Sequence, residues 1–326
     1  MMTAMLAGCG NSGGGTDGGS SDGGSSAGSN YDMTLIMAQR DEFLGELEAA
    51  AKAVASEVGV SLTTQDANSD TGKMLQYIET ARNNGEKAII INMVDPATAA
   101  QCVEAAGDMK VVFVNRYPTD PSVLNESAVY VGSDEMTSGK FQGDYLSELF
   151  KSQGKSEIRY ILLNGILGQT STENRTASLL QAFKDNGVTA IEAAAPLAAD
   201  YDRATAQDMI SPLVDTAEYD CIISNNDAMA LGAIEALKSK NIDPTSIPIV
   251  GIDATADGRQ AIKDGSMAMT VFQNPVGQGR GALLAAKNLV DGKNVAEGTG
   301  YETDETGNIL WVPFEPVTID NVADYE

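Results

Sequence analysis

Short apolar runs alternate with longer amphipathic stretches along nearly the whole chain after residue 30, and this alternation constrains the fold more than any other feature. Strands that alternate with helices of this length form βαβ units and parallel sheets. The sequence therefore predicts an α/β fold. The apolar runs that we interpret as strands are residues 33–38, 60–64, 88–91, 111–114, 128–131, 158–163, 188–192, 221–224, 247–252 and 268–272. The helical stretches between them are residues 43–58, 71–83, 97–106, 135–152, 172–186, 202–214, 228–239, 256–263 and 276–291.

The predicted strands are too many for one comfortable open sheet, so we expect two doubly wound parallel-sheet domains. The chain has 326 residues, which is enough for two domains of ordinary size. Strands such as residues 88–91 (AIII) are apolar throughout, as is usual for strands covered by helices on both faces. No linker rich in proline, glycine or serine separates the two halves, which indicates several close crossings between them.

The N-terminal residues differ in composition from the rest of the chain. Residues 6–9 (LAGC) place small residues before a cysteine, a pattern typical of a lipobox, in which signal cleavage leaves Cys9 to carry a diacylglycerol. Residues 10–30 are mostly glycine and serine and cannot bury apolar surface, which predicts a disordered tether. We therefore expect a signal remnant at residues 1–9 and an extracytoplasmic protein, lipid-anchored to a bacterial membrane through Cys9. The alternative is a disordered tail with a chance cysteine.

Charge and composition exclude several classes of function. The formal net charge of −25 argues against nucleic-acid and anionic-membrane surfaces and disfavours strongly anionic ligands. The chain contains no histidine, which removes Ser-His-Asp catalysis, Cys-His catalysis and imidazole metal sites. No apolar stretch after residue 30 is long enough to span a bilayer. A neutral or zwitterionic small molecule fits this composition better.

Two cysteines follow Cys9. Cys102 lies in a helical pattern and Cys221 in an apolar run, so both are expected to be buried free thiols. A disulfide between them remains an open alternative at this stage.

Polar residues follow most of the predicted strands at their carboxyl ends, where open α/β sheets bind ligands. Asx side chains at such turns often only cap the next helix, and we assign Asp95 and Asp227 to that role. Capping explains less well why so many strand ends are polar at once. Amides, carboxylates and arginine make bidentate hydrogen bonds with adjacent hydroxyls, which predicts a polyol or sugar pocket. The strand-end residues are Gln39, Arg40, Asp41, Glu42, Phe43, Asn92, Asn115, Arg116, Asn164, Gln169, Ser171, Arg175, Asn225, Asn226, Asp253, Gln273 and Asn274.

Two aromatic residues accompany these strand ends. Phe43 follows Asp41 and Glu42, where its ring is placed to stack on the apolar face of a pyranose. Tyr201 lies between two aspartates and is a candidate for the opposite face of the sugar. The alternatives are core packing for Phe43 and an exposed loop position for Tyr201.

Four segments resemble the periplasmic galactose/glucose-binding protein family, the hexose-binding branch of the bacterial ABC-importer receptors. They are residues 92–97 (NMVDPA), 129–134 (VYVGSD), 225–238 (NNDAMALGAIEALK) and 248–254 (PIVGIDA). The resemblance covers residues 31–326. It implies a periplasmic binding protein type 1 fold, in which two α/β domains joined by a three-segment hinge close around one sugar. On this basis we expect an N-terminal lobe of residues 31–117 plus 274–299 and a C-terminal lobe of residues 118–273 plus 300–326.

The resemblance also implies roles for individual residues. The positions that it places against sugar hydroxyls are Asp41, Asn92, Arg175, Asn226 and Asp253, with Phe43 as a stacking ring. The strand-end argument selects the same residues and adds Arg116.

This chain departs from the family pattern at several of the ligand positions. Gln169 and Ser171 stand where the family has a histidine and an aspartate, and Tyr201 is the nearest match to a stacking tryptophan. Gln273 stands where the family has an asparagine of the hinge. These changes keep a polar site but remove one ionic acceptor. In place of the family's calcium loop, residues 151–157 (KSQGKSE) are short and basic, so we expect no metal and no other cofactor.

The resulting prediction is a receptor, not an enzyme, that captures a neutral monosaccharide and delivers it to an ABC importer. A glucose- or galactose-type hexose is the expected ligand, and the permease subunits and the membrane are the expected partners of a monomer that binds no nucleic acid. One alternative is a sugar sensor that feeds a chemoreceptor or a membrane kinase. Another is a secreted carbohydrate-active enzyme that uses Asp41 and Asp253 as paired carboxylates.

Overall fold

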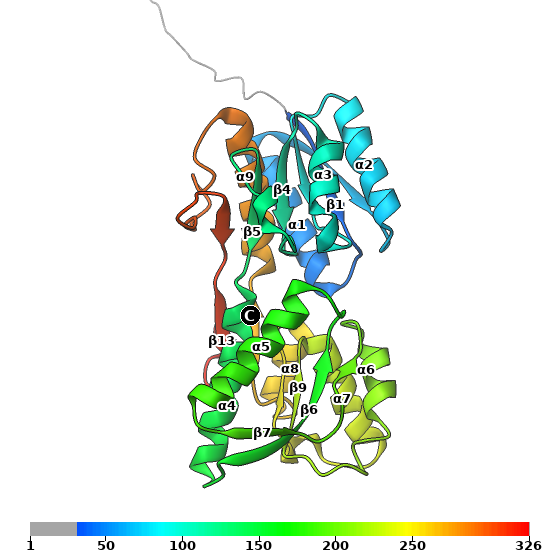
Figure 1. Ribbon diagram of the computed structural model, residues 1–326, viewed down its shortest axis with the longest axis vertical. Coiled ribbons are helices and arrows are strands. Elements are labelled where there is room, and N and C mark those ends of the chain that lie inside the picture. The colour runs from blue at the N-terminus through cyan, green and yellow to red at the C-terminus, as the bar shows by residue number, and fades with distance from the viewer. Residues whose placement is uncertain (1–30, 326) are drawn as a thin grey trace, which may run out of the picture.

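The computed structural model describes residues 31–325, which form two α/β lobes arranged one above the other along the long axis of the molecule (Figure 1). Each lobe is built on its own parallel sheet, which confirms the predicted α/β class. The predicted anchor at Cys9 and the predicted tether at residues 10–30 lie outside the described residues. Across residues 31–325, no helix combines the length and the apolar character that crossing a bilayer requires.

The first lobe contains a six-stranded sheet with helices on both faces. α1 (Glu42–Val58) and α9 (Pro275–Asp291) share a buried core with one face of the sheet. α2 (Thr71–Asn83) and α3 (Ala99–Ala106) share a second core with the opposite face. Neighbouring strands are all parallel, in the order β12 (Ile309–Trp311), β5 (Ala128–Gly132), β4 (Lys110–Val114), β3 (Ala88–Ile91), β1 (Tyr31–Met37) and β2 (Val60–Asp66).

The second lobe contains a five-stranded parallel sheet. α4 (Glu135–Ser152) and α5 (Thr170–Asp185) cover one face. α6 (Arg203–Ile210), α7 (Asp227–Ser239) and α8 (Ala256–Lys263) supply buried side chains to the core on the other face. The strand order is β10 (Ile249–Val250), β9 (Cys221–Ser224), β6 (Glu157–Asn164) and β7 (Thr189–Glu192), with β8 (Leu197–Ala198) paired to the far end of β6.

Two glycines of α4 allow α4 and α5 to approach closely. A Cβ atom added at Gly139 would lie 1.9 Å from the carbonyl oxygen of Arg175, and one added at Gly143 would lie 2.6 Å from the Cβ atom of Ala182. A larger residue at either position would push the helices apart. The close packing matters for the site because α5 carries Arg175 and α4 begins at Glu135.

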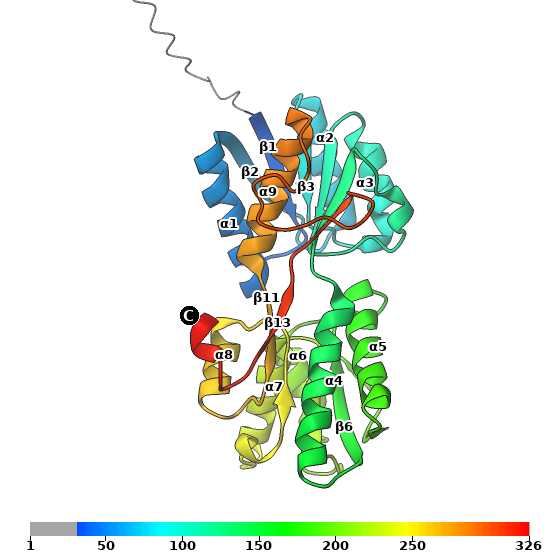
Figure 2. The same ribbon diagram turned by 90° about the vertical axis from the view of Figure 1, so that its left-hand side faces the viewer.

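Three segments of the chain cross between the lobes (Figure 2). The first joins β5 to α4 through Ser133, the second joins β11 (Thr270–Gln273) to α9, and the third joins β12 to β13 (Phe314–Val317). β11 and β13 are paired in an antiparallel ladder, so two of the crossings are hydrogen-bonded to each other. Gln278 of α9 donates a hydrogen bond to the Ser133 hydroxyl at 3.0 Å and so connects the remaining crossing to α9.

Short 3₁₀ helices interrupt the loops. Three of them begin at a proline that follows an aspartate, and in each the aspartate carboxylate accepts a hydrogen bond from the backbone N–H two residues later. The predicted capping role of Asp95 is therefore confirmed, since its carboxylate accepts from Ala97 N at 2.9 Å. The 3₁₀ helices are Pro96–Thr98, Pro121–Val123, Pro244–Ser246 and Val322–Tyr325.

The predicted lobe boundaries need correction at two places. β5 pairs with β4, and β12 pairs with β5, so both strands belong to the first sheet although we assigned residues 118–273 and 300–326 to the second lobe. The polar stretch 119–127 is a connection within the first lobe, and the chain crosses only after β5. Nothing in the polarity of that stretch distinguishes a connection between lobes from a connection within one.

Cys102 and Cys221 are both free and fully buried. Cys102 lies in the core of the first lobe and Cys221 in that of the second, which removes the alternative of a disulfide between them. Burial raises the pKa of the Cys102 thiol to about 12, so this thiol stays protonated and unreactive at neutral pH.

Candidate functional site

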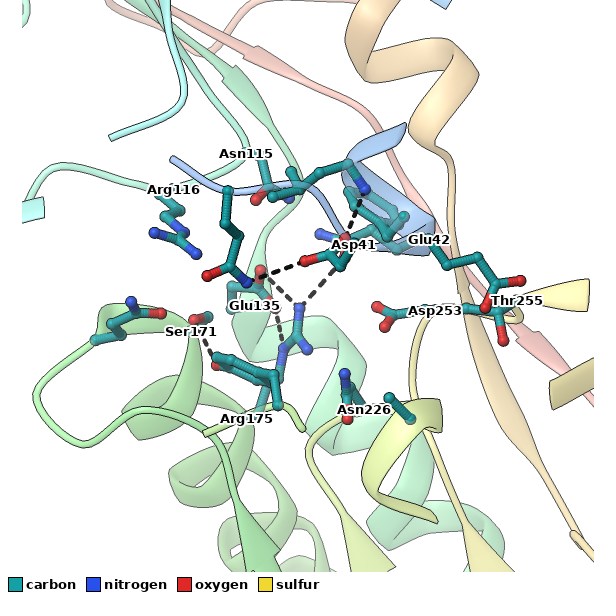
Figure 3. A pocket seen from close by; sticks show the side chains of 17 residues that line it. Asp41, Glu42, Asn115, Arg116, Glu135, Ser171, Arg175, Asn226, Asp253 and Thr255 are labelled. Atoms are coloured by element: carbon teal, nitrogen blue, oxygen red, sulfur yellow. Dashed lines mark hydrogen bonds and ion pairs between the residues drawn. The ribbon is translucent and has the colours of Figure 1, made fainter. Parts of the chain in front are cut away.

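A cavity lies between the two lobes, at the carboxyl ends of both parallel sheets. Its volume is about 100 Å³, well below the roughly 300–1,000 Å³ of pockets for drug-sized ligands, so it suits a single small ring. In Figure 3, Asp41, Asn115 and Arg116 approach it from the first lobe, and side chains such as Arg175 and Asn226 approach from the second. The lining residues are Gln39, Asp41, Glu42, Phe43, Leu44, Asn115, Arg116, Glu135, Gln169, Ser171, Arg175, Tyr201, Asn226, Ala228, Asp253, Thr255 and Gln273.

The structure brings together all but one of the residues predicted to contact a ligand. Those that line the cavity are Asp41, Phe43, Arg116, Gln169, Ser171, Arg175, Tyr201, Asn226, Asp253 and Gln273.

Asn92 is the exception, because its side chain is fully buried behind the cavity wall. Its Oδ1 accepts a hydrogen bond from Ala38 N at 3.2 Å. Its Nδ2 donates to the carbonyl of Val114 at 3.2 Å and to Oδ1 of Asn115 at 3.3 Å. The predicted sugar contact of Asn92 is therefore replaced by a structural one, in which Asn92 ties the ends of neighbouring strands together and orients Asn115 in the lining.

Asp41 both caps α1 and lines the cavity. Its Oδ1 accepts from Leu44 N at 2.8 Å, and its Oδ2 accepts from Nε2 of Gln39 at 3.2 Å. Each carboxylate oxygen has a second lone pair, which leaves acceptor capacity for a ligand hydroxyl. The capping and binding interpretations of this aspartate are thus compatible.

Arg116 is half-buried at the end of β4 and is held by the first lobe. Its Nη1 donates to the carbonyl oxygens of Met93 at 2.8 Å and Val94 at 3.0 Å. The guanidinium has five N–H donors, so these two bonds leave others that can reach the cavity.

Arg175 is buried and its guanidinium is held on several sides. Its Nε donates to Oε2 of Glu135 at 2.6 Å and its Nη2 donates to Oε1 of the same carboxylate at 3.1 Å. Its Nη1 donates to the carbonyl of Asn225 at 2.6 Å, and its Nη2 also lies 3.4 Å from Oε1 of Gln273. Burial alone would lower the pKa of Arg175, but the Glu135 carboxylate reverses this and raises the pKa above its ordinary value. Arg175 is therefore a fixed positive charge.

Glu135 is the one lining residue of clear importance that the sequence reasoning missed. It is the first residue of α4, directly after the first hinge crossing, and it is buried beside Arg175. Acidic residues are common in the first turn of a helix because they interact favourably with the helix dipole, so nothing in the sequence distinguished this glutamate from such a residue. The one feature of the sequence that could have indicated its burial is Gly139, one turn later in α4, because a glycine there allows α4 to pack closely against α5.

Asp253 lies three residues after β10, on a strained backbone. Its φ angle is 120° and that of Ala254 is 51°, a conformation that non-glycine residues rarely adopt and that is concentrated at functional sites. Burial raises the pKa of Asp253 well above its ordinary value, and the positive charge of Arg175 only partly opposes this. Among residues 31–325, no side chain donates a hydrogen bond to the Asp253 carboxylate, so its oxygens remain available to the cavity.

Asn226 lines the cavity and also caps α7, whereas Asp227 does not have the capping role predicted for it. Asn226 accepts from Met229 N at 3.0 Å through Oδ1, and within residues 31–325 its amide nitrogen has no hydrogen-bond partner, so this group can serve the cavity. Asp227 is fully buried and does not cap α7. It accepts instead from Oγ1 of Thr270 at 2.6 Å and from Thr255 N at 2.9 Å. Burial raises the pKa of Asp227 to about 7. The assignment of Asp227 to capping was therefore wrong.

Tyr201 forms a wall of the cavity and is clamped by its neighbours. Its hydroxyl lies 2.8 Å from Oγ of Ser171 and 2.8 Å from Oγ1 of Thr172, and its φ angle is 64°. A Cβ atom at Gly165 would lie 2.0 Å from the Cζ atom of Tyr201, so only glycine leaves room for the ring. The ring is held in one orientation before any ligand arrives.

The arrangement as a whole offers carboxylate acceptors, amide groups and fixed guanidinium donors, together with the rings of Phe43 and Tyr201. Adjacent hydroxyl groups, which donate and accept at once, match such a set. An aromatic ring suits the apolar face of a saturated ring.

A family model for the periplasmic binding protein domain matches residues 34–294. The chain belongs to the periplasmic binding protein family. Members of this family are binding proteins, and the relatives below are likewise named as binding proteins, so the site binds a solute and is not an enzyme active site. The predicted family resemblance is thereby confirmed.

The curated relatives of this periplasmic binding protein include two of similar length. The D-galactose/methyl-galactoside binding periplasmic protein of Haemophilus influenzae is 30% identical over 292 residues, covering 86% of each chain. The putative rhizopine-binding protein of Rhizobium meliloti is 31% identical over 271 residues, covering 82% of this chain and 83% of the relative.

Among solved structures, an ABC transporter solute binding protein from Bacillus halodurans with bound myo-inositol superposes with a TM-score of 0.79. It is 26% identical and the alignment covers 92% of this chain and 99% of that one. A periplasmic solute binding protein from Actinobacillus succinogenes with bound D-allose has a TM-score of 0.77 at 20% identity, covering 91% and 100% of the two chains. The latter likeness shows the shared fold.

Proposed function

We propose that this protein is an extracytoplasmic receptor that binds one neutral sugar ring between its lobes and delivers it to an ABC importer. The observation that carries the proposal is that Asp41 of the first lobe and Asp253 of the second line the same small cavity. A ligand that bonds to both carboxylates holds the lobes together, so binding energy favours the closed state. The closed state is then the form that a membrane permease recognises.

A hexose in its pyranose form is our first candidate ligand. The Haemophilus relative is named for D-galactose, and the cavity offers two aromatic rings and several bidentate partners for adjacent hydroxyls. A cyclitol presents nearly the same ring of hydroxyls and is bound by the Bacillus halodurans protein. The panel that tests the proposal therefore includes both chemistries.

The test is isothermal titration calorimetry of residues 31–326 with glucose, galactose, allose, xylose, ribose and myo-inositol. We expect saturable one-to-one binding of one six-membered ring. Asp253→Ala should weaken it by about 2–5 kcal/mol, because hydroxyls of the bound ligand lose a buried charged partner. Asp264→Ala, at the exposed end of α8, serves as the matched control and should bind normally. Absence of heat with every member of the panel would refute the proposal.

We also propose that the receptor acts as a monomer tethered by a lipid at Cys9. A tether keeps the receptor concentrated near its permease without a new contact between them. Membrane fractionation of the full chain and of a Cys9→Ser variant tests the anchor. The native chain should sediment with membranes and the variant should be released, whereas equal distribution of the two would rule out an anchor at this cysteine.

A further inference from the structure

Glu42 makes a hydrogen bond between the two lobes at a point away from the hinge. It is the first residue of α1 in the first lobe, and its Oε1 accepts from Ala256 N at 3.2 Å. Ala256 is the first residue of α8 in the second lobe. Figure 3 shows the Glu42 side chain extending toward Thr255, which immediately precedes Ala256. The contact therefore joins the two lobes beside the cavity, which Glu42 and Thr255 both line, and it is made only while the lobes are together.

The backbone N–H groups at the start of α8 show why this contact is special. Thr255 N donates to Oδ2 of Asp227 at 2.9 Å, and Gly258 N donates to Oγ1 of Thr255 at 3.1 Å. Both of these partners belong to the second lobe and persist when the cleft opens. Ala256 N, in contrast, receives its partner from the first lobe. Separation of the lobes returns this N–H to water and removes one of the negative charges near the positive end of the α8 dipole, while Asp257 in the first turn of α8 remains.

Glu42 also lies at the start of its own helix, so a single carboxylate sits between the N-termini of α1 and α8. Charged neighbours of both signs act on the Glu42 carboxylate. Asp257 and Glu46 repel the carboxylate, while Arg203 attracts it and pairs with Asp257 at 2.9 Å. Burial and the repulsion from Asp257 raise the pKa of Glu42 above its ordinary value. The contact therefore favours closure but is weakened by the negative charges of Asp257 and Glu46, of which Asp257 has the larger effect.

We propose that the Glu42–Ala256 contact is an interlobe clasp that sets the fraction of closed receptor, and thereby the affinity and residence time of the ligand. The inference rests on the proposed function in one respect, namely that closure accompanies binding. Apparent affinity rises in proportion to the fraction of molecules in the binding-competent state. A clasp formed after the ligand has entered changes mainly the dissociation rate.

Ala256→Pro deletes the donor of this clasp while leaving every side chain of the cavity in place. Proline is favoured at the first position of a helix, where its ring suits the backbone and its missing N–H has no partner within the helix. Thr255 already has φ −59° and ψ 165°, the extended conformation that a residue before proline prefers. Glu42→Ala removes the acceptor instead, so the two variants interrupt one contact from opposite sides.

Asp257→Asn is expected to increase the fraction of closed receptor, because it removes the repulsion between Asp257 and Glu42 that opposes the clasp. Asp264→Asn at the far end of α8 is the neutral control. The first measurement is small-angle X-ray scattering of the full chain without sugar. Glu42→Ala and Ala256→Pro should shift the ligand-free population toward the open form, and Asp257→Asn should shift it toward the closed form.

The second measurement is the dissociation rate of D-galactose and of myo-inositol as probes. We expect Glu42→Ala and Ala256→Pro each to raise it about two- to tenfold, as is typical for a partly exposed charge–dipole contact, with little change in association rate. The double variant should release the probe no faster than either single variant, since the two substitutions delete the same contact. The clasp would be overturned if the two substitutions multiplied each other's effect on the dissociation rate. It would also be overturned if Ala256→Pro left the scattering of the ligand-free protein unchanged. If neither probe binds, the proposed hexose or cyclitol specificity fails, whereas the ligand-free scattering still decides the clasp.

Discussion

The carboxylate of Glu135 accepts two hydrogen bonds from the guanidinium of Arg175, at 2.6 Å from Nε and 3.1 Å from Nη2, and both side chains are about 95% buried. The pair is supplied by α4 and α5, which two glycines allow to touch. A bidentate carboxylate fixes the plane of the guanidinium as well as its position. Glu135 therefore acts through Arg175 and positions it for a ligand.

We expect Glu135→Ala to reduce the free energy of unfolding by about 3–5 kcal/mol, because it leaves the Arg175 charge buried and unpaired. Sugar binding should weaken as well, since the guanidinium loses its orientation. Denaturant unfolding and calorimetry measure the two effects separately. The double variant Glu135→Met with Arg175→Met should recover most of the stability but none of the binding. Recovery of binding in that variant would show that the pair has no part in recognition.

The buried carboxylate of Asp227 predicts a pH dependence of stability. Its pKa is about 7 in the folded protein, above the ordinary value of 3.8, so the folded state binds this proton more tightly than the unfolded state does. The stability contributed by this group is therefore complete below about pH 4 and is lost as the pH rises to about 7. We expect a loss of about 2–4 kcal/mol across this window.

Asp227→Asn should flatten that pH profile. The amide can still accept from Thr255 N and can donate to the Thr270 hydroxyl, so the variant keeps the local contacts of the protonated acid. Urea unfolding at several pH values between 4 and 7 provides the comparison. Asp95→Asn, at an exposed cap, should retain the native slope. An unchanged slope in Asp227→Asn would show that another group causes the dependence.

Gly165 should tolerate no side chain. A Cβ atom there would overlap the ring of Tyr201 at 2.0 Å, so Gly165→Ala must displace a wall of the cavity. We expect a loss of affinity of about tenfold or more, with a modest loss of stability of about 1–3 kcal/mol from overpacking. Gly45→Ala is the matched control, because Gly45 lies within α1 with open space around it. That variant should bind normally and gain about 0.5–1 kcal/mol of stability.

The single tryptophan should report ligand binding. The ring of Trp311 is stacked on Tyr117 with a centroid distance of 6.2 Å, and Tyr117 follows the cavity residue Arg116. Trp311 also immediately precedes the third hinge crossing, so movement of the lobes should change its surroundings directly and a ligand at Arg116 should change them through Tyr117. We expect tryptophan emission to change in step with calorimetric saturation and the change to shrink in Tyr117→Leu. Constant emission at saturation would show that this region does not move.

Much of the fold was predictable because its strands are unusually apolar and the helices between them are strongly periodic. β12 was not predicted, since residues 309–311 are a short run isolated from any helix and only their neighbour β5 makes them a strand. For the same reason β5 was assigned to the wrong lobe. Sheet membership depends on which strand lies alongside, and that information is absent from local pattern.

The site was predictable as a set, because parallel strands bring their carboxyl ends to one edge. Individual roles were less so. Asn92 and Asn115 follow adjacent strands with the same residue type, yet one is buried behind the wall and the other lines the cavity. Asn226 lines the cavity and also makes the capping bond that was predicted for Asp227, because a shift of one position decides which side chain caps the helix, while Asp227 is buried away from the cavity.

β12 also determines when the first sheet can be completed. The second sheet uses only strands between Glu157 and Val250, so all of its strands are available well before the chain ends. The first sheet begins with the first described residue but lacks its edge until residues 309–311 arrive beside β5, and its core lacks α9 until residue 291. The core of the second lobe in turn lacks Phe314, Val317 and Val322 until the last residues of the chain arrive. Neither lobe can therefore be completed until nearly the whole polypeptide is available.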